Sequence, residues 1–150
     1  MKPRSLPDTL SGLLACAIDD ARQLDRSLYL PYAGEWHVQQ QNLCQVCLSG
    51  AVMASSLEAD PLKELSPSDF PQDAMNKLFA LNRMRCGDWI TAWHHLYGGS
   101  PSLTVSNRLL ELPQPQYCHF DGWEHFEAHL RCLEALVPHL RTIEQLNESC

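Results

Sequence analysis

The stretch Trp36–Leu57, WHVQQQNLCQVCLSGAVMASSL, decides the fold that the sequence predicts. It contains no Asp, Glu, Lys or Arg, and after Asn42 apolar or small side chains fill almost every position. A helix that is apolar on nearly every side has to be buried, and small residues such as Gly50 and Ala54 let neighbouring backbones approach closely. The pattern therefore predicts a buried central helix near residues 44–58, with the other elements packed around it.

Apolar residues at three- and four-residue spacing predict further helices on both sides of this segment. One helix is expected near residues 8–26, a second begins near Gln72, and a third follows Asp88 as its N-terminal cap. Trp89 and Trp93 share one face of that third helix, which places both in the core.

The C-terminal third of the chain completes the predicted fold. Residues 100–112 are interpreted as a short helix, and the longest helix carries an apolar seam from Trp123 onwards, with Pro138 kinking or dividing it. We therefore expect an all-α fold, a single compact domain over residues 1–150, with five to six helices around the buried helix at 44–58.

Charge and hydropathy exclude two classes of partner. Acidic residues outnumber basic ones by 18 to 11, giving a net charge of −7 with histidine neutral, and the basic residues are scattered singly. Binding to a nucleic-acid backbone needs clustered Lys and Arg, so direct nucleic-acid binding is disfavoured. No stretch reaches eighteen apolar residues, and Pro7 and Asp8 interrupt the N-terminal apolar run, so neither a membrane span nor a secretory signal is expected.

The seven cysteines suggest a cytoplasmic protein with reduced thiols, because their number is odd and no export signal is recognised. Cys44 and Cys47 form a C-x-x-C pair, which can hold zinc or act as a redox couple. This pair runs directly into an apolar segment, so the favoured interpretation is two small core side chains. The alternative is a zinc site completed by Cys118 and His119, the only adjacent Cys/His pair elsewhere.

Catalytic motifs are absent from the sequence. His125-Phe-Glu-Ala-His129 departs from the metalloprotease motif because Glu127 stands one position too late. Neither a phosphate-cradling glycine loop nor a nucleophile elbow is present. We expect no enzymatic activity and no cofactor.

Three aromatic residues are candidates for partner binding. Tyr29, Tyr32 and Trp36 lie close together in a segment that Pro31 and Gly34 interrupt. Tyr and Trp are enriched at the energetic centres of protein interfaces. This segment is therefore the predicted partner-binding surface.

The segment Trp36-His-Val followed by Cys44-Gln-Val-Cys47-Leu-Ser-Gly-Ala-Val-Met-Ala resembles small uncharacterised proteins encoded by bacteriophages and prophages of proteobacteria. Proteins of that kind often act by binding a host complex, for example as inhibitors of CRISPR interference. The resemblance implies a non-catalytic, phage-derived protein of the bacterial cytoplasm that modulates or inhibits a host or defence complex, as anti-CRISPR proteins do. The acidic balance suits a partner with a basic channel. A homodimer through the seam Trp123–Leu146 is a further alternative.

Overall fold

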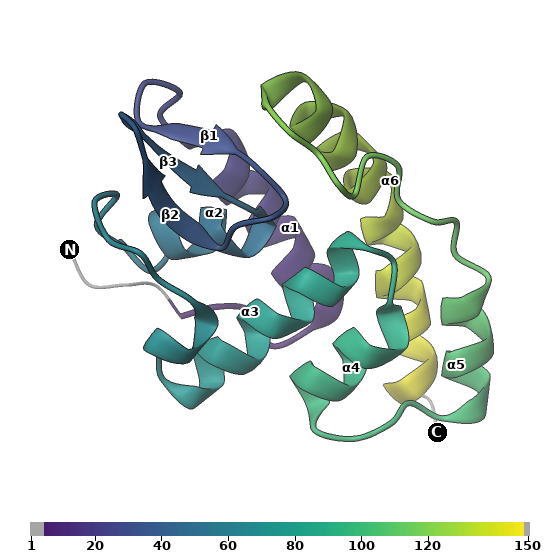
Figure 1. The fold of residues 1–150 in the computed structure, drawn as a ribbon. Helices are drawn as coiled ribbons and strands as arrows, with labels where there is room; N and C mark the ends of the chain where they lie inside the picture. The colour runs from purple at the N-terminus through teal and green to yellow at the C-terminus, as the bar shows by residue number, and fades with distance from the viewer. Residues whose placement is uncertain (1–4, 149–150) are drawn as a thin grey trace.

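The computed structural model describes residues 5–148 as a mostly helical protein with a small sheet at one end (Figure 1). The predicted helical class is correct in outline, but the sheet was not predicted. In chain order the elements are α1 (Leu10–Arg22), β1 (Tyr29–Pro31), β2 (His37–Gln40), β3 (Leu43–Val46), α2 (Leu48–Ser55), the 3-10 turn η1 (Pro67–Asp69), α3 (Gln72–Arg85), α4 (Trp89–Tyr97), α5 (Leu103–Leu110) and α6 (Trp123–Glu148).

The segment predicted as a central helix at 44–58 is divided at Cys47. Leu43–Val46 forms the middle strand of the sheet, and only Leu48–Ser55 is helical. The prediction is therefore wrong for residues 44–47. The four-residue strand buries Cys44 and Val46 and leaves Leu43 and Gln45 half-exposed, an alternation too short to distinguish from a helix within one apolar run.

The sheet has the order β1-β3-β2, with β3 parallel to β1 and antiparallel to β2. Cys44 pairs with Tyr29 on one side, and Gln45 pairs with Val38 on the other. The hairpin between β2 and β3 turns through Gln41, which has a left-handed φ of 55°. These pairings satisfy the backbone of β3 on both sides, which explains why the segment is a strand.

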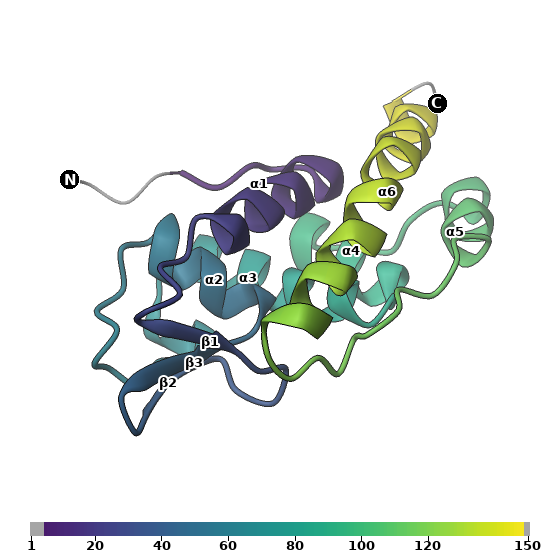
Figure 2. The ribbon, with the colours of Figure 1, turned by 90° about the horizontal axis from the view of Figure 1, so that it is seen from above.

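Helix α2 occupies the centre, as predicted for the helical part of this segment. Every residue from Leu48 to Met53 is buried, and the helix packs against the sheet on one side and against α1 and α3 on the other (Figure 2). Its small polar residues bond to both neighbouring helices. Ser49 Oγ donates to the Leu78 carbonyl at 2.7 Å, and Ser55 Oγ donates to the Asp20 carbonyl at 3.1 Å.

The remaining helices follow the sequence patterns closely. Helix α3 begins at Gln72, the Asp88 side chain caps α4 by accepting from the Thr91 N–H at 3.2 Å, and Trp89 and Trp93 are buried. The short helix predicted between 100 and 112 is α5. Helix α6 runs through Pro138 without being divided.

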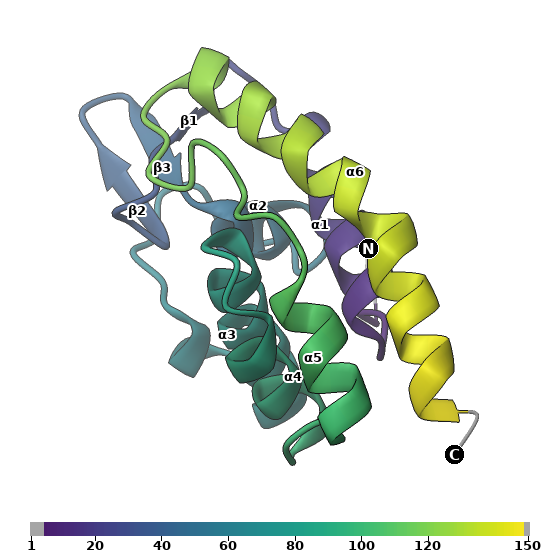
Figure 3. The same ribbon diagram turned by 90° about the vertical axis from the view of Figure 1, so that its right-hand side faces the viewer.

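The apolar seam of α6 is buried against α1 within the same chain, and the two helices run side by side (Figure 3). Phe126, Leu130 and Leu133 have almost no exposed surface. Arg22 adds an ion pair to Glu134 at 2.5 Å across the two helices. Because α1 already covers the seam, a homodimer through this face of α6 would require the two helices to separate.

We predict that Gly50→Ala destabilises the protein severely. A Cβ at this position would lie 1.8 Å from the Trp36 carbonyl oxygen, a backbone atom that cannot move without shifting the sheet. We expect the free energy of unfolding to fall by about 3 kcal/mol or more. Urea unfolding measures the loss. Gly99→Ala is the matched control, because a Cβ at that position meets nothing within 4 Å. This substitution should change the free energy of unfolding by about 1 kcal/mol or less. Equal stability of the two variants would contradict the packing described.

Candidate functional site

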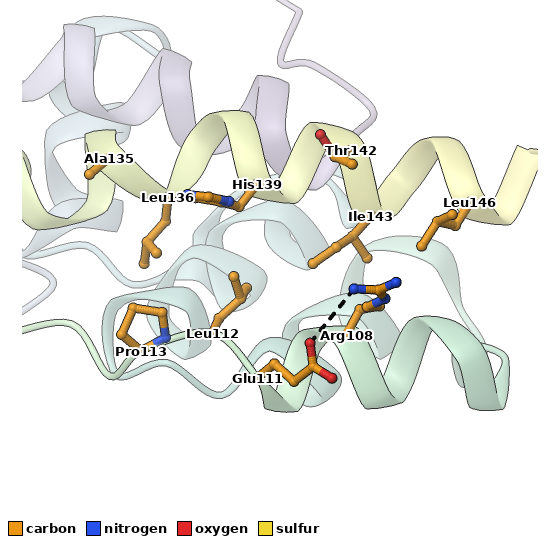
Figure 4. Close-up of a pocket in the computed structure, with 10 residues that line it drawn as sticks. All are labelled: Arg108, Glu111, Leu112, Pro113, Ala135, Leu136, His139, Thr142, Ile143 and Leu146. Atoms are coloured by element: carbon orange, nitrogen blue, oxygen red, sulfur yellow. Dashed lines mark ion pairs between the residues drawn. The ribbon is translucent and has the colours of Figure 1, made fainter.

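An open groove of about 500 Å³ lies between α5 and the second half of α6 (Figure 4). Leu136 and Ile143 point from α6 toward α5 and toward the turn at Leu112 and Pro113, which closes one end. Leu136 and Ile143 are themselves buried, at 5% and 6% exposed, so the apolar surface that stays open in the groove comes from the residues beside them, Ala135, Pro113 and the half-buried Leu112 and Leu146.

The groove exists because α6 has two apolar faces and only the short helix α5 packs against the second one. One face packs along α1, and the other carries Leu136, Ile143 and Leu146. Helix α5 is only eight residues long and buries just Val105 and Leu109. Leu136 and Ile143 are nonetheless buried, so the part of the second face that stays open lies at Ala135 and Leu146.

The rim of the groove is polar. Arg108 and Glu111 form an ion pair at 3.8 Å at the C-terminal end of α5, and both side chains are more than half exposed. Such pairs contribute little to stability, so both groups are available to a partner. His139 is exposed on the α6 side. An apolar floor with a polar rim is the arrangement found at protein interfaces.

Two exposed leucines extend the apolar surface over the outer side of α5. Leu103 is 78% exposed and Leu110 is 71% exposed, and their seven-residue separation places them on one helical face. Leu110 also lines a smaller hollow against α4, together with Trp89 and Ile90. Helix α5 is thus flanked by a hollow on each side, of which the one against α6 is mostly apolar and the one against α4 is mixed.

The predicted partner-binding residues lie elsewhere, around the sheet. Tyr29 is buried in β1, so its ring is part of the core. Tyr32 is half-buried and makes a backbone bridge to Asp121. Trp36 is half-buried and packs edge-on against Phe79, with ring centroids 5.8 Å apart. A role in partner binding stays a prediction for Tyr32 and Trp36.

The structure does not bring the predicted zinc ligands together. Cys44 lies on β3, whereas Cys47 caps α2, where its sulfur accepts from the Gly50 N–H at 3.4 Å. The Cys118 thiol contacts Cys86, and His119 is exposed. Across residues 5–148, no three His, Cys, Asp or Glu side chains are grouped so that they could hold a metal ion.

The two thiols of the C-x-x-C pair are also unsuited to redox chemistry. Burial raises the pKa of Cys44 to about 11 and raises the pKa of Cys47 as well. A reactive thiol needs a lowered pKa, because the thiolate is the nucleophile. Both cysteines therefore act as small core side chains, which is the favoured interpretation of the sequence.

The groove itself was not predicted from the sequence, although a signal for it is present. Leu136 and Ile143 stand seven residues apart on α6, outside the seam that packs on α1. A helix with two apolar faces needs two neighbours. The sequence does not show that the second neighbour would be too short to cover its face.

Comparison of the chain with protein-family models, with curated proteins and with solved structures gives no match. None of the helices within residues 5–148 combines the length and the apolar character needed to cross a lipid bilayer.

Two histidines are fully buried with one ring nitrogen unpartnered. His37 Nδ1 lies 2.9 Å from the Lys63 carbonyl, and His129 Nδ1 lies 2.7 Å from the Gln116 carbonyl, so each Nδ1–H donates. Both Nε2 atoms are buried without a hydrogen-bond partner among the described residues. Burial lowers the pKa of both rings and takes that of His129 to about 4.

We predict that His129 makes the protein acid-sensitive. Its pKa is lower in the folded state than the usual 6.5, so the unfolded chain binds more protons and stability falls as the pH drops below about 6.5. At pH 4.5 the loss relative to pH 7.5 is about 2–3 kcal/mol from this group. In urea unfolding at the two pH values, the His129→Gln variant should lose less stability than the unchanged protein, by that amount. The glutamine side chain retains an N–H that can donate to the Gln116 carbonyl. An equal loss in both proteins would contradict the assignment.

Proposed function

We propose that this protein is a non-catalytic binding protein that holds an amphipathic helix of a partner protein in the groove between α5 and α6. The observation that carries the proposal is the open groove of about 500 Å³ with an apolar floor and a polar rim. Helices that bind in this way place one apolar face in a hydrophobic groove and keep their polar face in water.

The dimensions of the groove fit such an occupant. Its lining on α6 runs from Ala135 to Leu146, which at 1.5 Å per residue spans about 17 Å, or about three helical turns. A partner helix of that length presents apolar side chains at positions i, i+3 or i+4, and i+7. The groove is only partly enclosed, which favours a ligand that keeps one face in water over an enclosed small molecule.

Charge complementarity specifies the polar face of the partner helix. Arg108 and Glu111 largely cancel one another at the rim, so the long-range field at the groove comes from the net charge of −7 on the whole chain. An acidic protein attracts basic surfaces and accelerates their association. The proposed ligand is therefore a helix whose flanks carry Lys or Arg.

The source of the partner rests on a separate argument. The resemblance of Trp36–Ala54 to phage and prophage proteins supports a partner within a bacterial host or defence complex, as for an anti-CRISPR inhibitor acting in the cytoplasm. The proposed binding of a partner helix in the groove does not depend on that origin. The binding mode and the origin of the partner are thus independent proposals.

We predict that a synthetic amphipathic helix with leucines on one face and lysines on its flanks binds the groove. In NMR titrations the peptide should shift the backbone amides of α5 and of residues 135–146 in a saturable way. A peptide with glutamate in place of lysine should bind at least about tenfold more weakly, because it meets the acidic protein with like charge.

The variant pair His139→Arg and Gln145→Arg tests the location. Both positions are exposed on α6 and both changes add one positive charge, but only His139 lines the groove. His139→Arg should weaken binding of the lysine peptide by about tenfold, and Gln145→Arg should change it by about threefold or less. Equal effects of the two variants, or shifts centred on the sheet, would overturn the proposal.

A further inference from the structure

Two thiols meet where the turn between α3 and α4 packs against the loop that joins α5 to α6. Cys86 follows the last residue of α3, and Cys118 lies in the loop. Both cysteines are free, and their side chains are in hydrogen-bonding contact. Because α4 and α5 separate them in the chain, the fold alone brings them together.

The residues on either side of Cys86 also hold the turn against the loop. Arg85 Nη1 donates to the Cys118 carbonyl. Gly87 has a left-handed φ of 79°, and a Cβ there would lie 2.8 Å from both Gln114 Oε1 and Pro115 Cδ. The contact between the two thiols is therefore part of a closely packed junction rather than an isolated meeting of two side chains.

The loop is held from its other side as well. The His129 Nδ1–H of α6 donates to the Gln116 carbonyl at 2.7 Å, and the Ala33 N–H donates to the Phe120 carbonyl at 3.0 Å. These bonds lie two residues before and two residues after Cys118. The backbone that carries this thiol is therefore fixed in place.

A disulfide can form only between cysteines whose side chains already approach one another, since otherwise the backbone has to move. Cys86 and Cys118 meet this condition, and both are half-buried, so a small oxidant in water can reach them. The C-x-x-C pair differs in this respect. Cys44 and Cys47 are 1% and 2% exposed, which shields both sulfurs from such an oxidant.

We propose that Cys86 and Cys118 form a redox-sensitive link, which a low-molecular-weight disulfide oxidises to an intramolecular disulfide and a small thiol reopens. The link is separate from the groove between α5 and α6 and does not depend on the function proposed for it.

The oxidation proceeds by two thiol–disulfide exchanges. One cysteine thiolate attacks the small disulfide, forming a mixed disulfide and releasing one small thiolate. The second cysteine thiolate then attacks the protein sulfur of the mixed disulfide, forming the bond between Cys86 and Cys118 and releasing the second small thiolate. The two cysteines lose two electrons, the small disulfide gains them, and the two thiol protons end on the two small thiols.

The surroundings of Cys86 set the rate of this exchange. Burial raises the pKa of Cys86, and its contact with Cys118 raises it further, whereas Arg85 and Arg83 offset part of the shift. Because the thiolate is the attacking form, the pair reacts slowly near neutral pH. It therefore responds to sustained oxidation and is not a catalytic redox couple.

The disulfide would stabilise the fold. It closes a ring of chain that contains α4 and α5. A cross-link over a ring of this length restricts the unfolded chain more than the folded one, which raises the melting temperature.

The test oxidises the folded full chain with oxidised glutathione, digests it with trypsin and identifies linked peptides by mass spectrometry. Peptides 86–108 and 109–131 each contain one cysteine, so their linkage identifies the pair without ambiguity. The share of this pair among all linked pairs should be at least about threefold higher in the folded chain than in a sample oxidised in urea, because folding brings the two thiols together.

The second readout is stability. The oxidised chain should melt about 5 °C or more above the reduced chain, and dithiothreitol should reverse the shift.

Three single variants locate the effect. Cys86→Ser and Cys118→Ser should each abolish the linked peptide and the oxidation-dependent melting shift, and using both guards against one of them misfolding. Cys132→Ser is the matched control, because Cys132 is a half-buried free cysteine of α6 that takes no part in the proposed link. This variant should retain the linked peptide and the full shift.

Three results would overturn the proposal. The first is a share of the Cys86–Cys118 pair that is no higher in the folded chain than in urea. The second is a linked protein that melts at the same temperature as the reduced protein or below it. The third is loss of the melting shift in Cys132→Ser, or its persistence in Cys86→Ser and Cys118→Ser.

Discussion

The close packing of the Trp36 carbonyl against Gly50 is the constraint on which the rest of the structure depends. It brings the loop before β2 directly onto α2, closer than any side chain at position 50 would permit. From α2, Ser49 and Ser55 bond to α3 and α1. Because α1 in turn packs along α6, the position of the groove depends on this central contact.

The two hollows show two different ways in which this fold leaves an interaction incomplete. The groove arises because α5 has eight residues and α6 has 26, so α5 is too short to cover the whole of the second apolar face of α6. At the second hollow, a cavity that residues 33–36 of the loop before β2 form with α2 and α3, the Nε–H of the buried Arg85 has no hydrogen-bond partner among the described residues. The groove suits a hydrophobic partner helix.

The sequence predicted the helices well because their signals are local. Asp88 caps α4, the helix after Gln72 begins where expected, and Trp89 and Trp93 are buried. The strand at Leu43–Val46 was missed because its stability comes from pairing with β1 and β2, which the run of apolar residues does not reveal. Neither hollow could be predicted, since each depends on how distant elements meet: Arg85 looks like an ordinary C-terminal helix residue in the sequence.

Photo-cross-linking in bacterial cells tests the central claim, that the groove between α5 and α6 holds a basic amphipathic helix. A photoreactive amino acid at Ala135, which lines the groove, is compared with the same residue at Gln145, which does not. We predict that the Ala135 probe links to one partner, and that the linked peptide is an apolar helix flanked by Lys or Arg. Equal linking from both positions, or a linked peptide without that pattern, would contradict the account.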